Sequence, residues 1–191
     1  MSAQVHLFPA RQQSAAFFSE CEIHRGAECM EHCTIEHCTG RRYRYQLRWS
    51  TGVHNHGVCL FALANPSTAN AKELDPTVRR CVGYAKSWGF GWCWVVNCRA
   101  WRATDPRDVP ADPLAVGPEN DQWVITSARN AHLVVCGWGE LGGDRGPEML
   151  KLIRSTGQTP HALKLTKSGA PGHPLYLSAA LKPFPLEVRG G

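Results

Sequence analysis

Three short polar segments, far apart in the chain, carry side chains that could orient water, contact the edge of a nucleobase and donate to a developing anion. Asn65 follows an apolar run and precedes Pro66, so its carboxamide could orient a water molecule from a rigid turn. Asn97 ends a second apolar run, and its amide can both donate and accept, which suits contact with a base edge. His173 lies between Gly and Pro residues that fix its backbone, and its imidazole could donate to a developing anion. Each residue alone is also explained by an ordinary turn or loop role.

Asp75 has two interpretations that the sequence leaves open. It directly precedes Pro76 and a helical pattern, which is typical of an N-cap residue. A carboxylate at the mouth of a loop could also act as a base, or stabilise a cationic transition state. A capping Asp can serve both roles.

Further residues of the same segments are candidates for contacts with a base or with phosphates. Contacts with the base are predicted for Pro66, Arg102 and Trp138. Contacts with the DNA backbone are predicted for Ser67, Thr68, Arg79, Lys167 and Ser168.

A cluster of Cys and His residues lies apart from these segments, in the stretch CEIHRGAECMEHCTIEHC at 21–38. A zinc site or, by number of thiols, an iron–sulfur cluster could form there, although the spacing matches no standard zinc finger. The alternative is a Cys-rich loop of no set structure. The candidate ligands are Cys21, His24, Cys29, Cys33 and Cys38.

Apolar patterning predicts alternating strands and helices from residue 41 onward. Such alternation indicates an α/β fold with helices on both faces of a mostly parallel sheet, and with the strand carboxyl ends on one edge. The polar segments would therefore meet at that edge. Strands are expected at 41–50, 58–64, 92–96, 132–138 and 161–165, and helices at 78–88, 116–130 and 146–157.

Length and composition indicate one α/β domain over 41–191, preceded by an N-terminal arm at 1–40 that carries the Cys/His-rich insertion. The net charge of +5 fits either simple solubility or a polyanionic partner. No apolar run reaches the ~20 residues of a membrane helix, and the N-terminus lacks the pattern of a signal peptide. We therefore expect a cytoplasmic protein, monomeric and without a membrane partner, whose cysteines are free thiols.

Several common enzyme classes are disfavoured by the motifs. The sequence contains no P-loop, no G-x-S-x-G and no dinucleotide fingerprint. This weighs against a nucleoside triphosphatase, a serine hydrolase or a dehydrogenase.

The ordered motifs RYRYQLRW, NPSTA, DPTVRRC, VVNCRAWRATDP, GPEND, GWG and TKSGAPGHPLYL, from about residue 41 to 178, resemble a prokaryotic family of unknown function. That family in turn is similar to the uracil-DNA glycosylase superfamily. The resemblance places Asn65-Pro66 at the water-activating loop, Asn97 at the base-contacting position and His173-Pro174 in the segment that enters the DNA. It implies a three-layer α/β/α fold with a short, mostly parallel central sheet.

The resemblance also implies an activity, that of a DNA glycosylase. Such an enzyme flips a base out of double-stranded DNA and hydrolyses its N-glycosidic bond, without any required cofactor. Resemblance to the anti-phage glycosylases of the superfamily implies glucosylated 5-hydroxymethylcytosine of phage DNA as the base. One departure is Asn65 in place of an Asp, because Asn can orient water but cannot take its proton. The alternatives are a hydrolase of free nucleosides or nucleotides, and a metal-stabilised nucleic-acid-binding module without catalysis.

Overall fold

The computed structural model describes residues 22–25, 32–37, 43–66, 74–103 and 106–187. Ser67, Thr68, Cys21, Cys29 and Cys38 lie outside these residues. The strands are β1 (Glu22–Arg25), β2 (His32–His37), β3 (Arg44–Ser50), β4 (Val58–Leu63), β5 (Trp92–Asn97), β6 (Leu133–Cys136), β7 (Pro160–Ala162) and β8 (Phe184–Pro185). The α-helices are α2 (Pro76–Ser87), α3 (Asn120–Arg129) and α4 (Arg145–Arg154), and the 3₁₀ helices are η2 (Pro106–Asp108), η3 (Gly139–Gly142), and η4 (Pro174–Tyr176).

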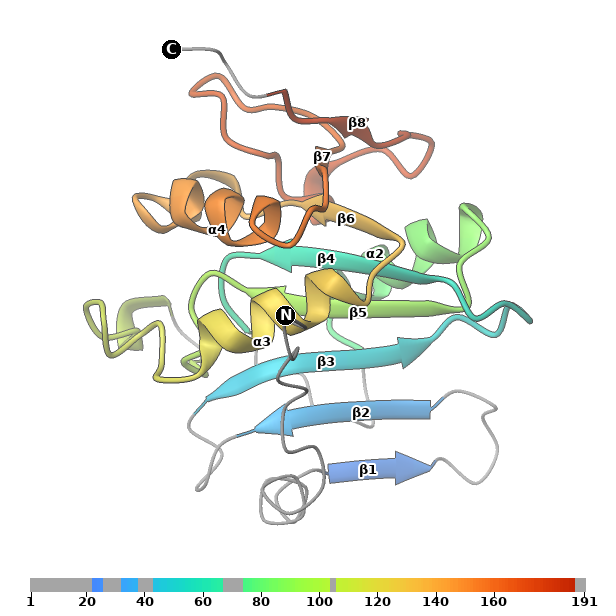
Figure 1. Cartoon of the computed structure of the whole chain (residues 1–191), viewed down its shortest axis with the longest axis horizontal. Helices are drawn as coiled ribbons and strands as arrows, with labels where there is room; N and C mark the ends of the chain where they lie inside the picture. The colour runs from blue at the N-terminus through green and yellow to red at the C-terminus, as the bar shows by residue number, and fades with distance from the viewer. Residues whose placement is uncertain (1–21, 26–31, 38–42, 67–73, 104–105, 188–191) are drawn as a thin grey trace, which may run out of the picture.

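All the strands belong to one mixed sheet, in the order β1-β2-β3-β5-β4-β6-β7-β8 (Figure 1). The four central strands β5, β4, β6 and β7 are mutually parallel. The predicted alternation of strands and helices from β4 to β7 is confirmed, and with it the α/β class. The prediction of a short, mostly parallel sheet is correct only for this centre, because antiparallel strands extend both sides.

Strands β1 and β2 extend the sheet beyond the expected domain boundary at residue 41. They pair with each other and β2 pairs with β3, so part of the predicted N-terminal arm joins the sheet. His24 and Cys33, two of the candidate metal ligands, are Cα partners in the β1–β2 ladder. The described residues contain no group of three or more His, Cys, Asp or Glu arranged to hold a metal, but this leaves the 21–38 cluster a prediction.

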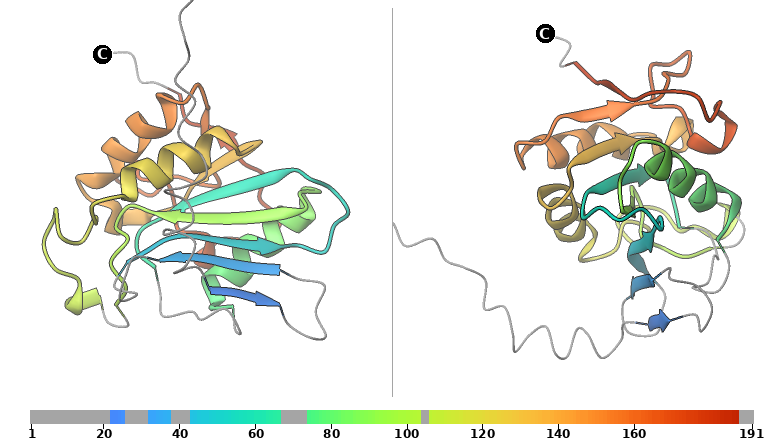
Figure 2. Two further views of the ribbon diagram at one scale, coloured as in Figure 1. Left: turned by 60° about the horizontal axis from the view of Figure 1, so that its bottom comes forward. Right: turned by 90° about the vertical axis from the view of Figure 1, so that its right-hand side faces the viewer.

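The sheet has a core on each face because side chains alternate along its buried strands. Leu47, Phe61 and Val95 pack with α2 on one face, whereas Leu60, Val96 and Val134 pack with α3 and α4 on the other. Figure 2 shows α2 on the opposite side of the sheet from α3 and α4. Helix α2 begins with an Asp75 cap and Pro76, as its sequence predicts.

Strand β3 differs from the half-buried strand that its alternating sequence predicts. Arg44 and Gln46, expected toward solvent, are 2% and 1% exposed. Helix α3 covers Gln46, whose amide donates to the Ser127 hydroxyl at 2.5 Å. Polar side chains that are satisfied by a covering helix cannot be distinguished from solvent-facing ones by periodicity alone.

Five cysteines among the described residues are buried. They are free thiols, and burial raises the pKa of each, that of Cys98 to about 12. The five are Cys59, Cys81, Cys93, Cys98 and Cys136. None of the helices among the described residues is long and apolar enough to cross a membrane.

Candidate active site

The register of the parallel strands brings Asn65 and Asn97 to the same edge of the sheet. Asn97 is the Cα partner of Leu63, two residues before Asn65. Beyond the strands, the Arg99 amide donates to the Ala64 carbonyl at 3.0 Å, so the two chain segments leave the sheet side by side. This is the convergence that the carboxyl ends of parallel strands predict.

His173 reaches the same edge because Gly137, directly after β6, allows a close approach. A Cβ on Gly137 would lie 2.8 Å from the Pro174 Cδ, whereas one on Gly139 would make an ordinary contact, 3.7 Å from the His173 Cβ. The Gly139 amide also donates to the Pro171 carbonyl at 2.7 Å. Since Gly137 directly follows β6, the parallel neighbour of β4, the His173–Pro174 segment packs against the carboxyl end of β6, beside the strand that leads to Asn65.

Helix α2 holds this segment from the other side. The Tyr84 hydroxyl donates to the Ser178 carbonyl at 2.6 Å, and Leu177 packs on the apolar core that α2 covers. Side-chain alternation along β5 places Asn97 on that same α2 face, with Val95 and Cys93. Asn97 and the His173 segment therefore share one face as well as one edge.

The buried polar atoms Asn65 Oδ1, Asn97 Oδ1 and His173 Nδ1 have no hydrogen-bond partner among the described residues. A buried acceptor without a partner costs about 1–3 kcal/mol, so native proteins keep few of them. These atoms belong to residues selected from the sequence for chemistry, and each can form a hydrogen bond with water or with a ligand. Asn97 is only 1% exposed, so a base must enter the interior of this edge to contact it.

Asp75 caps α2 and also influences His173. Its Oδ1 accepts from the Val78 amide at 2.7 Å, which confirms the N-cap interpretation. Burial lowers the pKa of His173, and the negative charge of Asp75 partly opposes that shift. The cap residue therefore lies near enough to His173 to act on it electrostatically, and its catalytic role stays a prediction.

The lowered pKa of His173 predicts a pH dependence of stability. As pH falls below the ordinary histidine pKa of about 6.5, the unfolded chain takes up a proton before the native one, so the native state loses stability. The stability of the wild type relative to His173→Gln should be greater at pH 7.5 than at pH 5. Urea unfolding of both proteins at the two pH values measures this. An advantage that grows toward pH 5 would contradict the assigned shift.

A cavity of about 420 Å³ opens beside His173. Trp138 forms part of its wall but is only 3% exposed, being packed against Gly142 and Gly146, so it can offer only a small surface to a base. Tyr176, by contrast, is 83% exposed, with its ring centre 5.6 Å from that of His173. Asn65 and Asn97 are not among the residues that line this cavity.

The candidate phosphate contacts differ in their availability. Arg79 and Lys167 are exposed at the start of α2 and in the turn after β7. Ser168, however, donates its hydroxyl to the Glu140 carboxylate, with 2.8 Å to either oxygen. A phosphate at Ser168 would have to displace this bond and meet a negative charge, so the structure does not favour that assignment. Ser67 and Thr68 lie outside the described residues.

Of the remaining base-contact candidates, Pro66 is buried directly after Asn65. Arg102 is half-buried and follows Trp101, which forms a bridge with Tyr43 before β3. Because β3 runs antiparallel to β5, this position lies at the same edge as the end of β5.

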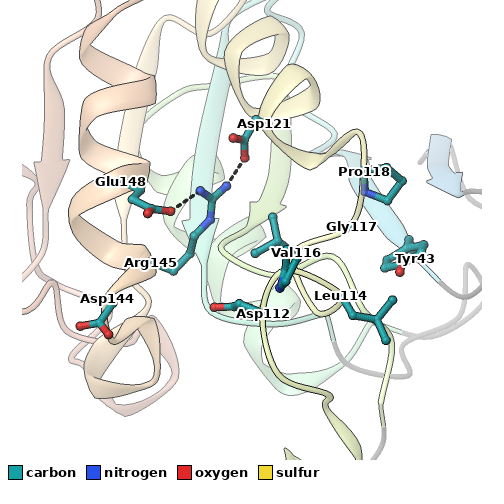
Figure 3. Close-up of a pocket in the computed structure, with 11 residues that line it drawn as sticks. Tyr43, Asp112, Leu114, Val116, Gly117, Pro118, Asp121, Asp144, Arg145 and Glu148 are labelled. Atoms are coloured by element: carbon teal, nitrogen blue, oxygen red, sulfur yellow. Dashed lines mark hydrogen bonds and ion pairs between the residues drawn. The ribbon is translucent and has the colours of Figure 1, made fainter.

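Two residues near the site were not selected from the sequence. Asn120 is fully buried, and its amide donates to the carbonyls of Asn97 and Cys98 at 2.9 and 3.1 Å. Arg145 is 6% exposed and forms ion pairs with Asp121 and Glu148, as Figure 3 shows. All three residues line part of a cavity of about 640 Å³. Asn120 belongs to the GPEND motif, and this was the only sequence signal available for either residue.

Adding a methyl group at Gly137 should impair the site. In Gly137→Ala the new Cβ meets the rigid Pro174 ring at 2.8 and 3.0 Å, so the His173–Pro174 segment must shift. We expect a loss of about 1–3 kcal/mol in the free energy of unfolding, and about 10²-fold in any activity of this site.

Gly83→Ala is the matched control for this substitution. A Cβ at Gly83 in α2 meets nothing within 4 Å, so the same chemical change should stabilise the protein by about 0.5–1 kcal/mol and leave activity intact. Chemical denaturation and activity assays of both variants measure the two effects. If Gly137→Ala and Gly83→Ala had the same stability and activity, the contact between Gly137 and Pro174 would not limit the residue at position 137 to glycine.

Residues 42–175, more than half of the chain, match the model of the family described as Protein of unknown function (DUF1643). The chain belongs to this family. The matched range contains Asn65, Asn97 and His173, and it agrees with the span over which the ordered motifs resemble a family of unknown function. No curated protein and no solved structure is significantly similar to the chain. The family description assigns no activity, so the link to the uracil-DNA glycosylase superfamily stays a prediction.

Proposed function

We propose that the protein is a DNA glycosylase that hydrolyses the N-glycosidic bond of a modified base in double-stranded DNA. The observation that supports this most strongly is the placement of Asn65, Asn97 and His173 at one edge of the sheet, each with a buried polar atom that has no partner within the described parts of the chain. The proposed fold is that of the uracil-DNA glycosylase superfamily, with the four parallel strands as its central sheet and α2 opposite α3 and α4 as its outer layers.

In the proposed reaction the base leaves the duplex stack and enters the edge beside Asn97, whose amide hydrogen-bonds it. Asn65 orients a water molecule toward the anomeric carbon. The C–O bond forms as the C–N bond breaks, and the electron pair of the C–N bond stays on the base. The water proton passes to Asp75 or to solvent, because the Asn65 carboxamide cannot accept it.

His173 acts in its neutral form. Since burial lowers its pKa, the imidazole is uncharged near pH 7 and donates a hydrogen bond to the departing base as negative charge develops there. The exposed Tyr176 beside it provides an aromatic surface on which an unpaired or neighbouring base can stack. Arg79 and Lys167 would contact phosphates.

The proposed substrate is a phage DNA that carries glucosylated 5-hydroxymethylcytosine, and the biological role is defence against such phages. The cavity of about 420 Å³ beside His173 is not lined by Asn65 or Asn97, and in the proposal it leaves room for the bulky substituent of a base that Asn97 contacts. No metal or cofactor takes part in this chemistry.

Purified protein incubated with modified and unmodified phage DNA tests the proposal. We expect abasic sites, revealed as strand breaks after alkali, in the modified DNA. Failure of folded protein to create alkali-labile sites in either DNA would reject the glycosylase activity. Strong inhibition by free nucleosides, together with cleavage that does not depend on duplex length, would favour instead a hydrolase of small nucleosides.

A further inference from the structure

We propose that Asn120 and Arg145 are positioning residues that hold the backbone of Asn97 and Cys98, and thereby fix where the Asn97 side chain meets its ligand. The role of Asn97 itself rests on the proposed function. The clamp at the end of β5 is a separate feature of the structure, and it can be measured without substrate.

The clamp acts on two consecutive carbonyl groups at the end of β5. One amide group of Asn120 lies 2.9 Å from the Asn97 oxygen and 3.1 Å from the Cys98 oxygen. The Arg145 Nε donates to the same Cys98 oxygen at 3.1 Å. Both side chains come from the helices on the α3–α4 face, whereas the Asn97 side chain lies on the α2 face. They therefore bond to the backbone of Asn97 and Cys98 from the face of the sheet opposite to the Asn97 side chain.

The amide groups of the same turn are held by the neighbouring strand. The Cys98 amide donates to the Leu63 carbonyl at 2.8 Å, and the Arg99 amide donates to the Ala64 carbonyl at 3.0 Å. In the turn after β5, the amide groups are thus held by the chain that follows β4, and the carbonyl groups by side chains of α3 and α4. Because Leu63 and Ala64 lead directly into Asn65, displacement of this turn would move both asparagines of the site.

Arg145 is itself held in place by two carboxylates. Asp121 on α3 and Glu148 on α4 form ion pairs with its guanidinium group, as Figure 3 shows. Arg145 is 6% exposed, whereas the carboxylates are 53% and 60% exposed. Removing the guanidinium would leave two hydrated acids rather than buried charges, so the protein should still fold.

The orientation of Asn120 also points to function rather than stability. The Asn120 Nδ2 group points toward two carbonyl oxygens, which can only accept hydrogen bonds. In this orientation the Asn120 Oδ1 is buried and has no partner among the described residues. A buried acceptor without a partner is unfavourable for folding. The observed orientation of Asn120 therefore favours the bonds that hold the turn over a partner for its Oδ1.

The kinetic test compares Asn120→Ala and Arg145→Met with wild type on a duplex that carries the modified base. Displacement of Asn97 should lower kcat about 10²-fold and change KM less than about threefold, because the DNA-backbone contacts remain. The matched control is Arg154→Met, which removes an Arg of the same helix that donates instead to the Leu186 carbonyl. Unchanged kcat in both clamp variants, or an equal loss in the control, would overturn the proposal.

Amide hydrogen exchange provides a readout that needs no substrate. The Cys98 and Arg99 amides should exchange at least about tenfold faster in the clamp variants than in wild type, with Val95 in the same strand unchanged. Faster exchange at all three amides would indicate global destabilisation and overturn a positioning role. If wild type proves inactive on DNA but exchange rises only at Cys98 and Arg99, the clamp is upheld and the proposed function alone fails.

Discussion

The His173→Ala protein is expected to form abasic sites about 10²–10⁴ times more slowly than the wild type. The departing base must accept negative charge as the glycosidic bond breaks, and His173 is the candidate donor at this edge. Its segment is fixed by Gly137, Gly139 and α2, so a shortened side chain cannot be replaced by a shift of the backbone. Single-turnover excision on a modified duplex measures the effect.

His161→Ala is the matched control for His173→Ala. His161 lies in β7, and its ring contacts only the carbonyl of Thr159 two residues away, at 2.9 Å, among the hydrogen bonds of the described residues. The two variants should unfold cooperatively like wild type, but only His173→Ala should lose activity. Full activity of folded His173→Ala would remove His173 from the mechanism.

Replacing Asn65 by Ala should lower the excision rate by about 10²–10³-fold, because the attacking water then loses its orienting group. Asn65→Asp should keep most of the activity, since a carboxylate orients water through the same atoms and can also accept a proton. The Asn65 Oδ1 has no partner among the described residues, so neither change breaks a hydrogen bond within them.

Asn130→Ala provides the corresponding control for Asn65, because Asn130 is an exposed residue after α3 whose amide donates only to Thr126 among the described residues. Excision rates of wild type, Asn65→Ala, Asn65→Asp and Asn130→Ala on one duplex at a single pH measure these effects. If Asn65→Ala is as active as Asn130→Ala, a water-orienting role at this position is wrong.

The convergence of the site could be predicted from sequence because it depends on strand direction alone. Apolar runs marked β4, β5 and β6, and parallel strands place their carboxyl ends together whatever the loops between them do. Thus Asn65 and Asn97 could be placed without knowing any contact. The approach of His173 was less predictable, because it depends on Gly137 and Gly139 lying against the Pro174 segment.

Other features could not be predicted because tertiary contacts decide them. Arg44 and Gln46 follow a solvent-facing pattern but are buried, Gln46 by contact with α3, and Ser168 donates to Glu140 from another loop. The burial of Arg145 has no local signal, because only Glu148 lies on its own helix and its other partners come from α3 and from the end of β5. Strands β1 and β2 could not be predicted because they lie in a Cys- and His-rich stretch that lacks strand periodicity.

The most direct test of the central claim is mass spectrometry of the small molecules released from duplex DNA. Duplexes with cytosine, 5-hydroxymethylcytosine and its glucosylated form would be incubated with wild type and with His173→Ala. We predict that wild type releases the intact free modified base, in amounts equal to the abasic sites formed, and that His173→Ala releases almost none. Absence of any free base with folded wild-type protein, or equal release by the two proteins, would contradict the account.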